Sequence, residues 1–170
     1  MLTKDQLSFF ETQGYLIVEN VFDQENILTP VRSEYAALLD KLIKEWVRSG
    51  VLSAPPEEAG FYEKLNFCYQ AGCDWFQPLD ISLPGDRITQ DTPMHFGPAV
   101  FNLLTCPRLL DIVGQLIGPE ITSNPIQHVR LKPPVAKLRH DEIRPHISHT
   151  DWHQDRGVAL HEADNTNMVT

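Results

Sequence analysis

The chain has 170 residues, of which 42% are hydrophobic and 22% charged, a balance typical of a globular protein large enough to bury a core. Lys and Arg together number 14 against 23 Asp and Glu, which gives a formal net charge of -9. This charge argues against nucleic acid or an anionic membrane as the main partner. It is compatible with a small-molecule substrate, because a pocket can be locally basic in an acidic protein.

The N-terminus, the apolar stretches and the cysteines indicate the cellular compartment. The N-terminus has no basic segment followed by an apolar run, and no apolar stretch approaches the length of a membrane span, so we expect neither a secretory signal nor a membrane helix. Cys68, Cys73 and Cys106 are odd in number and do not form a disulfide framework. A metal pair of Cys68 and Cys73 would lack a second pair, so we interpret all three as ordinary buried thiols. These features predict a cytoplasmic protein.

The N-terminus predicts a helix followed by a strand. Thr3 and Gln6 have the spacing of a capping box, and Gly14 is a helix stop, so the residues between them are expected to be helical. The apolar run from Tyr15 to Val18 then predicts a short buried strand.

Further helices are expected up to residue 120. Thr29 is the predicted cap of a long helix that ends at Ser49-Gly50, and its apolar residues are interpreted as core. Prolines break residues 51–97 into short pieces. These core residues are Val31, Tyr35, Leu38, Leu39, Leu42, Ile43 and Trp46, and the other predicted helices are 61–69, 98–104 and 107–117.

The C-terminal third contains the candidate strands. Val129 and Leu131 alternate with His128, Arg130 and Lys132. This pattern fits a half-buried strand with a solvated face, and it also fits a barrel strand whose polar face holds an anion. Residues 120–123 and 168–170 are weaker strand predictions.

Four ionisable residues then occupy alternate positions, His149, Asp151, His153 and Asp155. In an extended strand they would share one face. Imidazole and carboxylate ligands suit a non-haem Fe(II) site built from two His and one carboxylate. A His-x-Asp pair supplies two of those three ligands, and by spacing alone the two pairs are equivalent.

Three segments carry a resemblance to a known family, in the family's order along nearly the whole chain. The segments are Leu2-Thr3…Gln6…Phe9…Gly14-Tyr15-Leu16-Ile17-Val18, then Pro107-Arg108-Leu109-Leu110-Asp111…Leu116-Ile117-Gly118-Pro119, then Lys132-Pro133-Pro134 followed by Trp152-His153-Gln154-Asp155. The most specific part of this likeness is His-Gln-Asp after Lys-Pro-Pro. On these residues the chain resembles the phytanoyl-CoA dioxygenase family of Fe(II)- and 2-oxoglutarate-dependent oxygenases.

The resemblance implies an α+β fold, with helices in residues 1–120 and the first strands of a double-stranded β-helix, or jelly-roll barrel, in residues 121–170. In the family a distal His and an Arg that binds 2-oxoglutarate come from farther along the chain. Neither is found here, because the only later histidine, His161, follows His153 too closely. We therefore expect residues 1–170 to be one incomplete domain of a longer enzyme, inactive alone.

The resemblance also assigns roles. It favours His153 and Asp155 as the Fe(II) ligands, and it places His128 and Lys132 near the co-substrate 2-oxoglutarate. The other pair, His149 and Asp151, then forms a polar strand entry or supports the ligands. With O₂, this set implies hydroxylation of a small organic substrate. Because related halogenases have a small residue in place of the carboxylate ligand, Asp155 favours hydroxylation over halogenation.

Two alternatives remain open. One is a non-catalytic remnant of the same fold. The other is an unrelated metal-binding module that uses His146, His149, His153 and Asp155. The sequence predicts neither the substrate nor the oligomeric state.

Overall fold

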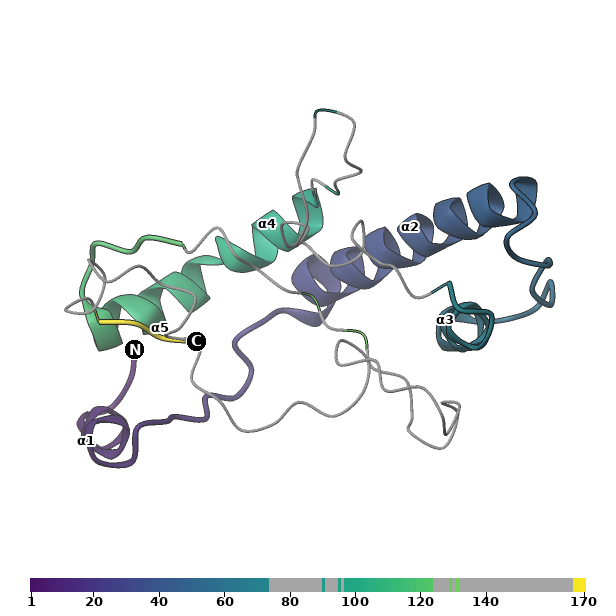
Figure 1. Cartoon of the computed structure of the whole chain (residues 1–170). Coiled ribbons are helices and arrows are strands. Elements are labelled where there is room, and N and C mark those ends of the chain that lie inside the picture. Colours follow the sequence, from purple (N-terminus) through teal and green to yellow (C-terminus); the bar gives the residue numbers. More distant parts are fainter. Residues whose placement is uncertain (74–89, 91–94, 96, 124–128, 130, 132–166) are drawn as a thin grey trace. The chain divides into compact units, whose positions relative to one another are not determined.

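A computed structural model of the chain describes residues 1–73, 90, 95, 97–123, 129, 131 and 167–170 (Figure 1). They divide into two compact units, one with residues 1–32, 97–123 and 167–170 and the other with the rest, and the boundary falls after Arg32. The helices are α1 (Lys4–Gln13), a short π-helical segment η1 (Gln24–Leu28), α2 (Thr29–Arg48), α3 (Phe61–Gln70), α4 (Pro98–Leu104) and α5 (Pro107–Ile117).

The predicted fold, helices followed by the first strands of a jelly-roll barrel, is wrong. The described residues form helices, turns and irregular segments, and no strand or sheet is found among them. Residues 120–123 and 168–170, both predicted to be strands, are irregular.

Tyr15 to Val18 show why one such prediction failed. Tyr15 and Ile17 are 56% and 76% exposed, whereas Leu16 and Val18 are half-buried, so the side chains alternate between solvent and protein. An extended segment becomes a strand only when a neighbour completes its backbone hydrogen bonds. No described residue pairs with these four as a strand, and an apolar run alone does not predict that partner.

Helix α1 begins and ends where the sequence predicts. The Thr3 hydroxyl accepts a hydrogen bond from the Gln6 backbone N–H at 3.2 Å, and the Gln6 side-chain oxygen accepts one from the Thr3 N–H at 2.9 Å. Gly14 follows with a φ of +77°, and its N–H donates to the Phe10 carbonyl at 2.8 Å. The Leu2 N–H also donates to the Gln115 side-chain oxygen at 2.8 Å, which ties the start of the chain to α5.

The N-terminal cap of the long helical segment is Asp23, not Thr29. The Asp23 carboxylate accepts a hydrogen bond from the Asn26 N–H at 2.6 Å, and the chain coils from Gln24 onward. Thr29 already has helical angles, φ -64° and ψ -45°, so the predicted cap lies inside the helical stretch. An Asp is as good a cap as a Thr, and the earlier one starts the helix here.

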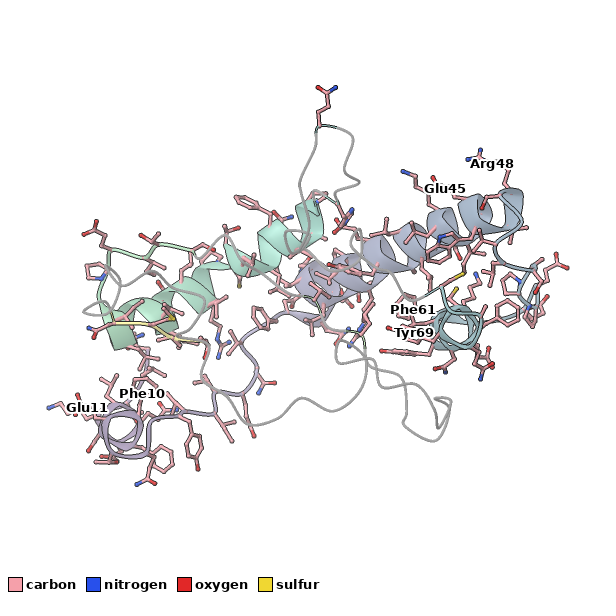
Figure 2. All side chains as sticks on the ribbon, viewed as in Figure 1. Phe10, Glu11, Glu45, Arg48, Phe61 and Tyr69 are labelled. Atoms are coloured by element: carbon pink, nitrogen blue, oxygen red, sulfur yellow. The ribbon has the colours of Figure 1, made fainter. Side chains whose placement is uncertain are left out.

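The core of the second unit is made of side chains from α2, from α3 and from the residues that follow these two helices. The buried face of α2 is the apolar stripe predicted for it, and its exposed residues include Glu45 and Arg48 at the C-terminal end (Figure 2). A hydrogen-bonded ion pair between the Lys64 ammonium and the Asp40 carboxylate, 2.7 Å apart, joins the two helices at their edge. The buried residues are Tyr35, Leu39, Leu42 and Ile43 of α2, Leu65, Cys68 and Tyr69 of α3, and Leu52 and Cys73.

The predictions of α3, α4 and α5 are confirmed. Pro98 and Pro107 each stand in the first turn of a helix, where a missing N–H costs little. In the first unit α4 packs against η1. Gly118 ends α5 with a φ of +101°.

Leu39→Ala should lower the free energy of unfolding by about 2–5 kcal/mol, because it removes a fully buried side chain and leaves a cavity in its place. Val47→Ala on the same helix, at a position 36% exposed, should change it by only about 0.5 kcal/mol. Urea unfolding followed by circular dichroism measures both. Equal losses in the two variants would contradict the assignment of this core.

Candidate functional site

The residues predicted to bind iron and 2-oxoglutarate lie outside the described part of the chain. They are His128, Lys132, His153 and Asp155, and His146, His149 and Asp151 lie outside it too. The nearest described positions are Val129 and Leu131, the two apolar residues of the segment around His128. Both are half-buried, but neither is part of a strand, although their alternation with polar residues predicts one.

One hydrogen bond connects that segment with the helices. The Tyr69 hydroxyl, from the last turn of α3 (Figure 2), donates to the Leu131 carbonyl oxygen. Tyr69 is only 2% exposed, and a buried tyrosine hydroxyl needs a polar partner. The contact holds the backbone against α3 at the residue directly before Lys132. Because 62 positions separate the two residues, no local sequence motif predicts this hydrogen bond.

An imidazole and a carboxylate meet elsewhere in the second unit. The His95 Nε2 atom lies 3.0 Å from the Glu34 Oε1 atom, and their side chains are 17% and 14% exposed. The Tyr35 ring packs edge-on against the imidazole, with centroids 5.9 Å apart. With its Nε2 atom protonated, the imidazole donates a hydrogen bond to the Glu34 carboxylate, and this contact orients the ring.

Sequence reasoning missed this pair. Residues 51–97 contain no motif that marks His95, and Glu34 lies 61 positions before it on α2. An acidic residue next to Tyr35, a predicted core residue, was the only available signal in the sequence. Alone it does not identify a partner.

The prediction of buried thiols is confirmed. Cys68, Cys73 and Cys106 are 0%, 6% and 8% exposed, and the structure holds each as a thiol. Burial, reinforced by the neighbouring Cys73, raises the pKa of the Cys68 thiol to about 12. Cys68 therefore stays protonated near neutral pH, and a protonated thiol is a poor nucleophile and metal ligand.

No complete metal site lies within the described residues. Among them, no three His, Cys, Asp or Glu side chains come close enough together to hold a metal ion. The pair of His95 and Glu34 provides two groups of this kind, one fewer than the facial arrangement of an iron oxygenase requires. An iron site would therefore need residues outside this part of the chain.

Comparison with known proteins leaves the family open. No protein-family model matches the chain, and no curated protein and no solved structure matches it. The likeness to phytanoyl-CoA dioxygenases therefore rests on the motif residues quoted above.

The described helices were also compared with the requirements of a membrane span. None of them is by itself both long and apolar enough to cross a bilayer. Helices α4 and α5 meet the requirement only when counted together, across a bend of 43°.

Tyr69→Phe should lower the free energy of unfolding by about 0.5–1.5 kcal/mol, since the ring keeps its packing while the Leu131 carbonyl loses its donor. Tyr62→Phe on the same helix is the matched control, because Tyr62 is 74% exposed. Amide hydrogen exchange should also speed up around residue 131 in the first variant alone. An unchanged exchange rate there would argue against the anchoring contact.

Proposed function

We propose that this chain carries the His-x-Asp pair of an Fe(II)- and 2-oxoglutarate-dependent dioxygenase that hydroxylates a small organic substrate. The observation that supports the proposal most is His153-Gln154-Asp155 placed after Lys132-Pro133-Pro134, in the order found in phytanoyl-CoA dioxygenases. Function depends on which side chains converge at a site, so the proposal rests on this motif and not on the overall fold.

The donor set fits the metal. One neutral imidazole from His153 and one carboxylate from Asp155 are two of the three ligands that non-haem Fe(II) takes in oxygenases. Bound iron supplies the activation of O₂ that is coupled to decarboxylation of 2-oxoglutarate. As a ligand, Asp155 would leave no room for the chloride that halogenases bind, so hydroxylation is the proposed outcome.

The remaining roles belong to groups that bind and orient. Lys132 and His128 offer N–H donors to the carboxylates of 2-oxoglutarate, and charge-assisted hydrogen bonds of this kind are among the stronger polar contacts. The hydrogen bond between Tyr69 and Leu131 fixes the backbone beside Lys132. In this proposal α3 positions the co-substrate segment and takes no part in the chemistry.

His153→Ala and Asp155→Ala should each weaken Fe(II) binding by more than the roughly 10–100-fold that loss of a supporting outer residue causes. Anaerobic titration of the full chain with Fe(II), with and without 2-oxoglutarate, measures this directly. In preparations that release succinate from 2-oxoglutarate, both variants should abolish that release, because each removes a ligand of the metal.

His149→Ala and Asp151→Ala are the matched controls, since they make the same changes four residues earlier, in the preceding His-x-Asp pair. Each control variant should weaken Fe(II) binding by no more than about 10–100-fold. If they lose binding while the first two variants keep it, the ligand pair has been assigned wrongly. If His146→Ala and His149→Ala weaken the metal as much as His153→Ala and 2-oxoglutarate has no effect, the chain is a metal-binding module instead.

A further inference from the structure

The C-terminal end of α3 has a hydrogen-bonding pattern that brings two cysteines together. The Cys73 N–H donates to the Cys68 carbonyl at 2.9 Å, and the Gly72 N–H donates to the Tyr69 carbonyl at 3.1 Å. Gly72 has a φ of +78°, in the left-handed region. This pair of bonds around a left-handed glycine is a Schellman motif, which reverses the chain at the end of a helix.

A Schellman motif frequently places the side chain after the glycine against the one three residues before the C-cap residue, here Ala71. Here both positions are cysteines, Cys73 and Cys68. Both are buried, and Cys73 contributes electrostatically to the raised pKa of Cys68, which requires the two thiols to be near each other.

The backbone distance is suitable for a covalent bond. The 2.9 Å hydrogen bond from Cys73 to Cys68, together with standard bond lengths, limits the two Cα atoms to about 7 Å apart at most. The bend at the carbonyl carbon shortens this further, and disulfides join Cα atoms about 4.4–6.8 Å apart.

We propose that Cys68 and Cys73 are a modification site, where a peroxide converts the two thiols into an intramolecular disulfide. The link closes the turn that ends α3. Cys106 lies in the other unit and is not part of the site.

Cys73 reacts first, because it is 6% exposed whereas Cys68 is 0% exposed and holds its proton tightly. Its thiolate attacks one oxygen of the peroxide and the O–O bond breaks. The departing hydroxide takes up a proton as water, and Cys73 becomes a sulfenic acid. As the Cys68 sulfur attacks the Cys73 sulfur and the S–O bond breaks, the departing hydroxide takes the Cys68 proton, so Cys68 reacts with thiolate character and a second water leaves. The two thiols are oxidised by two electrons, and hydrogen peroxide is reduced to two waters.

The test treats the full chain with hydrogen peroxide, alkylates the remaining thiols in denaturant, and maps peptides by mass spectrometry without reductant. The peptide that contains Cys68 and Cys73 should lose the mass of two hydrogens and carry no alkyl label. Treatment with dithiothreitol before alkylation should restore both labels. Cys106 should be labelled throughout.

Single cysteine substitutions test which two thiols form the bond. Cys106→Ser should form the disulfide as fast as the unmodified chain, whereas Cys68→Ser and Cys73→Ser should form none. The measurement on the unmodified chain needs no substitution, so it decides the proposal even if a core variant fails to fold. Oxidation of Cys73 to sulfinic acid beside an intact Cys68 thiol, a bond from either to Cys106, or complete resistance to peroxide would each overturn it.

Discussion

The second unit depends on the burial of one face of α2. Full burial of a leucine or isoleucine side chain contributes roughly 1.5–3 kcal/mol, and α2 buries four large side chains in this way. The ion pair between Lys64 and Asp40 joins the same two helices, but its side chains are 24% and 46% exposed, and such pairs contribute about 0–1 kcal/mol. Burial of these apolar side chains therefore contributes more to the stability of the second unit than the ion pair does.

The last turn of α3 holds two polar groups whose positions depend on this packing, the Tyr69 hydroxyl and the Cys68 thiol. The buried residues of α3 are Leu65, Cys68 and Tyr69. Cys68 and Tyr69 follow Leu65 by three and four positions, so all three lie on one side of the helix. Once the core fixes that face, the hydroxyl of Tyr69 is in place for the Leu131 carbonyl, and Cys68 is in place for Cys73. A single turn thus carries both the anchor of a distant segment and the proposed modification site.

The sequence predicted local features well and distant ones poorly. Thr3 with Gln6, Pro98, Pro107 and Gly14 act through their own backbone neighbours, so their effect is visible without the fold. Asp23 shows the limit of this reasoning, since two good caps six residues apart compete and the sequence does not say which one starts the helix.

Tertiary contacts explain the other failures. The predicted strand at Tyr15 needed a partner, and the pairs of His95 with Glu34 and of Tyr69 with Leu131 join residues about 60 positions apart. Periodicity describes one segment at a time, so it predicts which face is apolar without predicting what covers that face. The jelly-roll prediction came from the resemblance and not from the residues, and the described part of the chain did not bear it out.

The iron-site hypothesis requires a particular backbone conformation between His153 and Asp155, but it does not require a particular fold. Residues two apart on a helix point to different sides, so a helical His153 and Asp155 would not bind one ion together. In an extended backbone they share a face, which lets both reach the same metal. Joint binding of Fe(II) by these two residues would therefore require an extended conformation over three residues and nothing more. A metal-binding measurement thus tests the local conformation and the chemistry together, without any assumption about a surrounding sheet.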